Sequence, residues 1–246
     1  MIAIEKNIMV ASHRRSGTHL TIDSLINNLV GAGPSFVTLE TLLPQHKEHL
    51  TLEEFESKRT ANTTPIIKTH TLPDMEELSG DEQARAYAIA LRENSRVIYV
   101  LRDGRDVMVS FFEFRRRHTA AFRSVTFDTF LRQSYRNDLT PPAYWAHHVN
   151  AWANTDNVLI VTYENYHNAF ESTLSKLSKH VGLPVKNETI DMVISRNADA
   201  EKASSSVLFR RGLVGDYINY FSKEDLDFFE SEAAAGIELF DVHNAS

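Results

Sequence analysis

The sequence predicts an α/β fold: a single domain over residues 1–246 with a central, mainly parallel β-sheet flanked by helices. Short β-prone apolar runs alternate along the chain with segments of helical periodicity, and this alternation is typical of βα units with parallel strands. One run, at 97–101, is apolar on both faces, as a central parallel strand is. The 246 residues, 42% of them hydrophobic, are enough for one domain around one core.

The first predicted unit is a strand at 8–11, followed by a Ser-Gly-Thr turn and a helix. After the turn, Leu20, Leu25, Ile26 and Leu29 recur at helical spacing. The chain therefore begins with the strand, glycine turn and helix of a βα unit.

The later predicted elements continue the alternation of strand and helix. They are a partly helical segment at 51–64, a strand ending at 68–70, a helix at 82–91, a strand at 97–101 that turns through Gly104 into a helix, a helix at 143–155, a buried strand at 158–161, a helix at 169–185 stopped by Gly182, and an acidic helix at 224–234.

Residues 115–142 depart from this pattern. The segment is basic at its start, aromatic and irregular, and it ends at Pro141 and Pro142. We predict that it makes an excursion over the sheet and acts as a lid.

The composition argues against several classes of partner. A formal net charge of -7 provides no overall positive field for nucleic acid or an anionic membrane. No apolar run approaches the ~20 residues of a membrane span, and the absence of cysteine excludes disulfides and thiolate nucleophiles. We therefore expect a cytoplasmic protein that binds neither nucleic acid nor membrane.

Three polar segments, at 12–19, 68–70 and 102–110, each follow a predicted strand. Ligands of open α/β sheets bind beyond the carboxyl ends of the strands. Because all three segments come at such ends, we expect them to meet in one site.

The segment at 12–19, SHRRSGTH, has the residue types of an anion site. A glycine turn that leads into a helix presents backbone N–H groups without intrahelical partners, and the helix dipole adds partial positive charge. The alternative is an ordinary βα turn with exposed arginines. The nucleoside-triphosphate loop G-x-x-x-x-G-K-[ST] is not matched, because its first glycine and its lysine are missing.

Two further segments offer cations for an anion. Arg102 ends a strand and Ser110 lies in the next helix, so a guanidinium fork and a hydroxyl are available. The alternative is a surface ion pair between Arg102 and one of the aspartates that follow it. Arg210 and Arg211, before a Gly-x-x-Gly pattern, make another basic loop, for which the alternative is a solvated charge pair at a turn.

Lys68 and His70 lie at the end of a predicted strand, just before a proline. A histidine is a natural general base near neutral pH, and a lysine stabilises developing negative charge. The alternative is that His70, one of eleven histidines, is structural or on the surface. The position at the carboxyl end of a strand favours the catalytic interpretation.

Together these segments resemble the cytosolic-type sulfotransferase family, which uses 3′-phosphoadenosine 5′-phosphosulfate (PAPS). HRRSGTHL resembles the family's 5′-phosphosulfate loop, P-K-S-G-T-T-W, and YVLRDGRDVMVSFFEF resembles its 3′-phosphate strand and helix. KTH, VTYENY and FRRGLVGDYINYFS resemble its K-T-H, Y-E-D and C-terminal segments. The matches come in the expected order over about residues 9–222.

The resemblance implies a P-loop NTPase-like sulfotransferase fold, PAPS as co-substrate, 3′-phosphoadenosine 5′-phosphate (PAP) as product, and a small-molecule acceptor. It implies a set of co-substrate contacts: Arg15, Ser16, Gly17, Thr18 and His19 at the 5′-phosphosulfate, Arg102, Ser110, Arg210, Arg211 and Gly212 at the 3′-phosphate, and Tyr163 beside the adenine.

The resemblance also implies the catalytic roles. His70 would deprotonate the acceptor, Lys68 would steady the sulfuryl oxygens, and Arg15 would lie near the bridging oxygen. No metal is expected, since the adjacent His147 and His148 do not face one site on a helix. Both a hydroxyl and an amine acceptor remain open, as do a monomer and a homodimer.

Three positions depart from the family's pattern. Arg15 replaces the loop lysine, Leu20 replaces the tryptophan that stacks on adenine, and Tyr217 replaces the C-terminal tryptophan. Two other functions stay open: a P-loop kinase of nucleotides or small molecules, and a non-catalytic nucleotide-binding protein. A kinase requires a lysine directly after the glycine, and a non-catalytic protein has no need of Lys68 and His70.

Overall fold

Five parallel strands form one sheet in the order β2-β3-β1-β4-β5. The computed structural model describes residues 7–61, 64–78, 80–193 and 214–245. The strands are β1 (Asn7–Ser12), β2 (Phe36–Thr38), β3 (Ile66–Thr69), β4 (Ser95–Leu101) and β5 (Val158–Thr162). The predicted parallel sheet is confirmed. From β1 the chain continues to β3 on one side and to β4 on the other, so the strand order reverses at β1. Open α/β sheets bind ligands at such a point, beyond the carboxyl ends of the strands.

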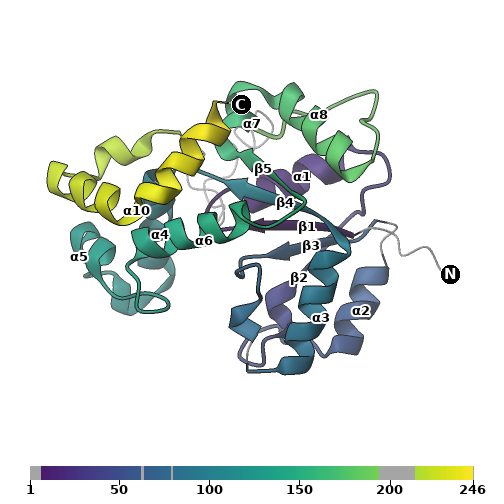
Figure 1. Ribbon diagram of the computed structural model, residues 1–246, viewed down its shortest axis with the longest axis horizontal. Coiled ribbons are helices and arrows are strands. Elements are labelled where there is room, and N and C mark those ends of the chain that lie inside the picture. The colour runs from purple at the N-terminus through teal and green to yellow at the C-terminus, as the bar shows by residue number, and fades with distance from the viewer. Residues whose placement is uncertain (1–6, 62–63, 79, 194–213, 246) are drawn as a thin grey trace.

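Helices cover both faces of the sheet (Figure 1). The α-helices are α1 (Thr18–Asn28), α2 (Leu52–Thr60), α3 (Glu82–Glu93), α4 (Gly104–His118), α5 (Phe127–Arg132), α6 (Pro141–Ala153), α7 (Tyr163–Asn168), α8 (Phe170–Val181) and α10 (Lys223–Asn244). The 3₁₀ turns are η1 (Leu39–Leu42), η2 (Glu76–Leu78), η3 (Ala120–Phe122) and η4 (Asp216–Asn219).

Alternate residues of the central strands enter two separate cores, as the period of a strand requires. Met9 and Tyr99 face the core built with α3, α6 and α10. Ile8 and Val10 face the other core, built with α1 and α8. This two-sided burial explains the continuous apolar runs within β1 and β4.

The edge strands differ from the sequence predictions. β2 is only three residues long, too short for a period-two pattern, and it was not predicted. The strand at 158–161 was predicted to be buried, but Val158, Leu159 and Ile160 are only half-buried. β5 is an edge strand, so one side of it has no neighbour in the sheet.

The segment at 115–142 is more regular than predicted. It contains the end of α4, η3, α5 and the start of α6, and Phe122 and Phe130 pack into the core. The predicted irregularity is therefore wrong for much of the segment. Its role as a lid stays a prediction.

The C-terminal helix α10 extends to Asn244, well beyond the predicted end at 234. Gly236 lies in the interior of α10. A larger residue does not fit there, because a Cβ atom would be 2.6 Å from Cζ3 of Trp145 and 2.9 Å from Cα of Ala146. α10 packs on α6 at this point.

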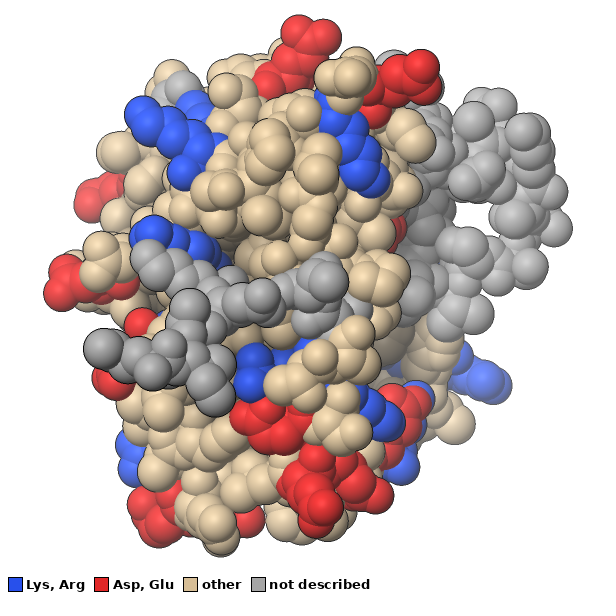
Figure 2. All heavy atoms as spheres, turned by 90° about the vertical axis from the view of Figure 1, so that its right-hand side faces the viewer, with Lys and Arg blue, Asp and Glu red and all other residues tan. Residues whose placement is uncertain are grey.

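The surface is mixed in charge on the side drawn in Figure 2, where described acidic and basic side chains are interspersed. Within the described ranges, no helix combines the length and the apolar character needed to cross a membrane.

Candidate active site

The turn between β1 and α1 has the backbone of an anion cradle. Arg15 (φ 73°) and Gly17 (φ 102°) are both left-handed, and no side chain in the described part of the chain caps α1. Ser16 is buried, and its Oγ makes no hydrogen bond to any described residue. The turn therefore offers backbone N–H groups and a hydroxyl to an anion at the positive end of a helix.

Tyr163 lies over this turn from the start of α7. A Cβ atom on Gly17 would be 2.6 Å from Cδ2 of Tyr163, so only glycine fits both the conformation and the space. Cζ of Arg102 lies 4.4 Å from the centre of the same ring. A phenol ring, a guanidinium and a helix N-terminus thus meet at one place.

Arg15, Arg102 and Ser110 come together from three elements. Nε of Arg15 donates to Oγ of Ser110 at 3.2 Å, and Nη1 of Arg102 donates to the carbonyl oxygen of Arg15 at 3.2 Å. Arg102 also pairs with Asp106 at 3.7 Å, but this pair is buried and not on the surface. The alternative of an ion pair between Arg102 and a following aspartate is therefore confirmed for Asp106, and only its predicted position at the surface is wrong. Asp103 pairs with Arg105 at 2.6 Å.

Asp106, in the first turn of α4, joins the C-terminal segment to the site. Its two carboxylate oxygens accept hydrogen bonds from the N–H groups of Gly215 (2.7 Å) and Tyr217 (3.0 Å). Burial raises the pKa of Asp106, and the charge of Arg102 opposes that shift. Cζ of Arg105 lies 4.2 Å from the Tyr217 ring. The predicted Arg210, Arg211 and Gly212 lie outside the described residues.

His70 is held in one tautomer at the end of β3. Its Nδ1 lies 2.9 Å from the carbonyl oxygen of Ser12, and a carbonyl only accepts, so Nδ1 carries the proton and Nε2 the lone pair. Burial of the ring lowers the pKa of His70 well below its ordinary value, and the charges of Lys68 and Arg14 lower it further. His70 is therefore a neutral imidazole at neutral pH, with Nε2 able to accept a proton.

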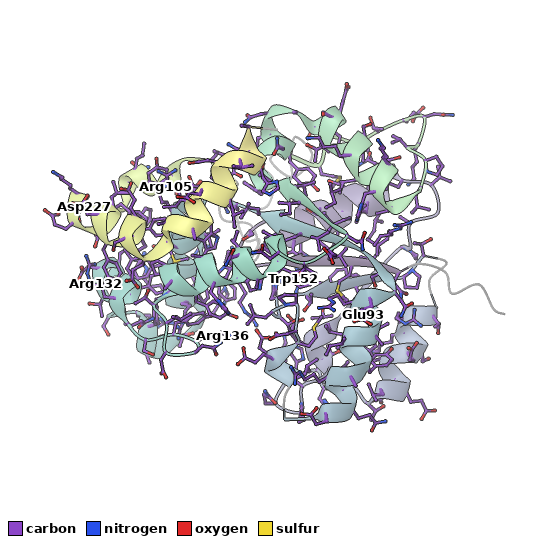
Figure 3. The ribbon with its side chains drawn as sticks, viewed as in Figure 1. Glu93, Arg105, Arg132, Arg136, Trp152 and Asp227 are labelled. Carbon is purple, nitrogen blue, oxygen red and sulfur yellow. The ribbon has the colours of Figure 1, made fainter. Side chains whose placement is uncertain are left out.

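A second layer of hydrogen bonds holds the main chain around His70. Nε2 of His148 lies 3.2 Å from the carbonyl oxygen of His70, and Nδ1 of His148 lies 2.9 Å from the hydroxyl of Tyr99. Burial lowers the pKa of His148 to about 3, so this imidazole is neutral as well. Trp152 lies on α6 (Figure 3). It stacks on Tyr99 and donates to the carbonyl oxygen of Thr71 at 3.0 Å.

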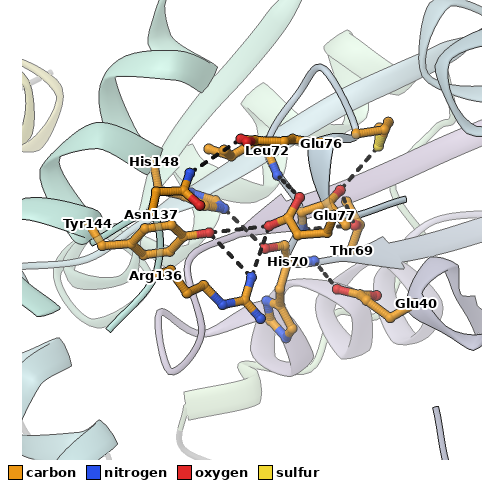
Figure 4. Close-up of polar contacts among 12 residues, drawn as sticks. Glu40, Thr69, His70, Leu72, Glu76, Glu77, Arg136, Asn137, Tyr144 and His148 are labelled. Atoms are coloured by element: carbon orange, nitrogen blue, oxygen red, sulfur yellow. Dashed lines mark hydrogen bonds and ion pairs between the residues drawn. The ribbon is translucent and has the colours of Figure 1, made fainter. Parts of the chain in front are cut away.

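Glu77 connects the loop after His70 to the segment before α6 (Figure 4). Its carboxylate accepts from the N–H of Leu72 (3.1 Å), from Arg136 (2.9 Å) and from the hydroxyl of Tyr144 (3.2 Å). The structure therefore ties residues 133–140 to the His70 loop.

Comparison with known families identifies the chain's family. The family described as "Sulfotransferase domain" matches residues 5–235. The chain belongs to this family. The predicted resemblance to sulfotransferases is therefore confirmed.

The individual sulfotransferase relatives are distant. Sulfotransferase 1A1 of Canis lupus familiaris is 24% identical over 168 residues, which are 60% of this chain and 57% of the relative. Sulfotransferase 6B1 of Danio rerio is 24% identical over 189 residues, 71% of this chain and 60% of the relative. The alignments thus span about three fifths of the length of these relatives.

Solved structures share the fold. Mouse sulfotransferase SULT7A1, complexed with PAP, has a TM-score of 0.62 at 22% identity and covers 92% of this chain and 83% of its own. Retinol dehydratase, in a complex with retinol and PAP, has a TM-score of 0.62 at 18% identity and covers 96% and 81%. The predicted sulfotransferase fold, related to that of P-loop proteins, is confirmed.

Two buried carboxylates near the site were missed by the sequence analysis. Oε1 of Glu164 accepts from the N–H of Asp103 at 3.2 Å, and burial raises the pKa of Glu164 to about 7. Glu164 follows Tyr163 in a segment already singled out, so its position was a usable indication. Glu40, which contacts His70, lies in a stretch without any motif.

The site contains histidines and carboxylates, but the described residues include no group of three placed to hold a metal ion.

Proposed function

We propose that this protein transfers the sulfuryl group of PAPS to a hydroxyl or amine of a small-molecule acceptor. The observation that carries the proposal is Ser12, which links the cradle to the base. Its Oγ lies 2.6 Å from Oγ1 of Thr18, the first residue of α1, and its carbonyl oxygen lies 2.9 Å from Nδ1 of His70. The anion cradle and the imidazole are thus joined through one residue.

PAPS supplies the activated sulfuryl group, and the residues of the cradle fit its anionic ends. The turn at 15–19 takes the 5′-phosphosulfate, with Oγ of Ser16, which has no hydrogen-bond partner among the described residues, as one donor. Arg102 and Ser110, with the predicted Arg210, Arg211 and Gly212, take the 3′-phosphate. Tyr163 lies beside the adenine, over Gly17.

The transfer needs one base and fixed positive charge. The acceptor gives its proton to Nε2 of His70 while its oxygen or nitrogen forms a bond to sulfur. The bond from sulfur to the 5′-phosphate oxygen breaks, and PAP leaves with the electron pair. Lys68 and Arg15 stabilise the charge on the sulfuryl and bridging oxygens, which is catalysis by positioning and preorganised electrostatics.

A small acceptor is supported by the names of relatives and neighbours. These include an amine sulfotransferase, a 3-alpha-hydroxysteroid sulfotransferase, and retinol dehydratase in a complex with retinol. Screening alcohols and amines for transfer of label from radioactive PAPS identifies the class. A thermal shift with magnesium-ATP but none with PAP would favour the kinase alternative.

Replacing the base tests the mechanism. His70→Ala is expected to lower turnover by about 10²- to 10⁴-fold, because the acceptor loses its proton acceptor, while PAP affinity stays unchanged. The measurements are label transfer from PAPS and calorimetric titration with PAP. His147→Ala, an exposed neighbour on α6, is the control and should keep full turnover; equal turnover in the His70 variant rejects His70 as the base.

Replacing Arg102 tests the 3′-phosphate site. Arg102→Ala is expected to weaken PAP binding roughly tenfold or more, since a charged hydrogen bond is lost, and to weaken adenosine 5′-phosphate much less. Affinities are measured for both nucleotides by calorimetry. Equal losses for the two nucleotides contradict the assignment of Arg102 to the 3′-phosphate.

A further inference from the structure

Glu40 brings to the end of β3 a carboxylate that the proposed mechanism does not use. It lies in η1, directly after β2, and only 6% of it is exposed. Thr38 of β2 pairs with Lys68 of β3. Glu40 follows Thr38 by two residues and His70 follows Lys68 by two, so the paired strands bring the two residues to the same end of the sheet, where they are in contact.

The two oxygens of the Glu40 carboxylate have different surroundings. Oε1 accepts a short hydrogen bond, 2.5 Å, from the backbone N–H of His70 (Figure 4). Oε2 is buried, and no described residue donates a hydrogen bond to it. A buried carboxylate normally has donors on both oxygens or an opposing charge nearby. We therefore expect a cation close to Glu40.

Lys68 is the cation on the adjacent strand, where it pairs with Thr38, two residues before Glu40. Burial lowers the pKa of Lys68; the charge of Glu40 raises it, and the charge of Arg14 lowers it. Lys68 in turn lowers the pKa of His70. The charged and titratable groups that act on Lys68 are thus Glu40 from η1, Arg14 from the β1–α1 turn and His70 from the end of its own strand, and Glu40 carries the negative charge among them.

We propose that Glu40 is a positioning residue of this sulfotransferase: one oxygen fixes the main chain of His70 and the charge of the other keeps Lys68 protonated at the site of transfer. The proposal rests on the proposed function, because it assigns value to His70 as base and to Lys68 as cation. The proposed role of Glu40 has two parts, a hydrogen bond and a charge. The side-chain amide of a glutamine at this position can still accept the hydrogen bond, but it carries no charge.

Glu40→Gln tests the charge without a change in shape. The protonation of Lys68 is followed by its reaction with an amine-reactive reagent at increasing pH, read at Lys68 by mass spectrometry. In the variant the midpoint of this reaction is expected to fall by about one pH unit, because an opposite charge has been removed. Turnover with PAPS should then decline at a lower pH on the alkaline side, while PAP affinity stays near that of the wild type.

Two controls bracket this result. Glu48→Gln removes an exposed carboxylate that pairs only with Lys47 among the described residues, and should leave the midpoint of Lys68 unchanged. Glu40→Asp keeps the charge but shortens the side chain; its Lys68 midpoint should stay near that of the wild type, while the altered hydrogen bond to His70 lowers turnover. An unchanged Lys68 midpoint in Glu40→Gln overturns the proposal.

A stability cycle covers the case in which Glu40→Gln folds poorly. Lys68→Met removes the cation that Glu40 offsets, so the double variant should melt at a higher temperature than the sum of the two single shifts predicts. Strict additivity counts against the coupling. If the wild type bound no PAP, the proposed function would fail, whereas the Lys68 titration and the cycle would still decide the role of Glu40.

Discussion

At the scale of single residues, Gly17 meets two separate demands. Its backbone is left-handed, with φ 102°, and the ring of Tyr163 occupies the place where a Cβ atom would lie, 2.6 Å from Cδ2. The same ring also contacts the guanidinium of Arg102. Any side chain at position 17 therefore disturbs the cradle and the stack above it together.

Gly17→Ala is expected to lower PAP affinity at least tenfold, since Tyr163 must move, and to destabilise the protein by about 1–3 kcal/mol through strain and overpacking. Gly182→Ala is the matched control. It is also left-handed, with φ 73°, but a Cβ there meets nothing within 4 Å. It should therefore cost about 1–2 kcal/mol and leave PAP binding intact. Urea denaturation and calorimetry give both quantities; similar affinities in the two variants would contradict the argument.

At the scale of elements, the contact between α6 and α10 depends on close approach. Gly236 of α10 lies against Trp145 and the backbone of Ala146 on α6. Gly104, at the start of α4, faces Trp145 and Phe229 in the same way, with Cβ distances of 2.7 Å. Small residues on two helices therefore make room for one large indole.

Gly236→Ala is expected to destabilise the protein by about 1–3 kcal/mol, although alanine favours a helix by about 1 kcal/mol over glycine. The reason is that the added Cβ meets backbone, which cannot turn aside. Ala235→Gly, on the exposed side of the same helix, should lose about 1 kcal/mol from helix propensity alone. Unfolding in urea measures both, and a stabilised Gly236→Ala would show that the helices can move apart.

At the scale of the whole molecule, three histidines from three elements face the interior around the site. His13 and His148 are buried, and their rings are 5.6 Å apart; His70 contacts His148 through its carbonyl oxygen. Burial, the largest cause in each case, lowers the pKa of all three. The folded protein therefore holds three neutral imidazoles.

Stability is expected to fall as the pH drops below about 6.5. There the unfolded chain binds protons on these histidines and the folded protein does not, which costs about 1.4 kcal/mol per pH unit for each histidine. Glu164 acts in the opposite sense, because its folded pKa of about 7 lets the folded protein take up a proton first. Asp106, whose pKa is also raised, acts in the same sense as Glu164. The pKa values of His167, His180 and His243 are lowered as well, so the histidines outnumber the opposing carboxylates among the described residues and the net slope still favours unfolding in acid.

Urea denaturation between pH 7.5 and 4.5 measures this slope. His148→Gln should reduce the slope of the unfolding free energy against pH by about one proton, or about 1.4 kcal/mol per pH unit. His147→Gln, which is exposed on the same helix, should leave the slope unchanged. Equal slopes in the two variants would mean that His148 does not carry the pH dependence.

The sequence by itself determined the local units of this protein. The strand, glycine turn and helix at its start, the order of later elements and the polar residues at strand ends all follow from patterns within a few neighbouring residues. The family followed as well, because its motifs are continuous stretches. Gly17, Lys68, His70 and Arg102 were therefore named before any contact between them was known.

Tertiary structure alone decided which of these residues touch and what supports them. Glu40 reaches His70 across 30 residues, Ser12 reaches it across 58 and Arg15 reaches Ser110 across 95. The first two contacts depend on β3 lying between β2 and β1, and the third depends on β4 lying beside β1; strand order cannot be read from a local sequence pattern. Glu40 acquires its role from His70, which is its neighbour only in the folded structure. Periodicity and motifs in the sequence therefore do not indicate it.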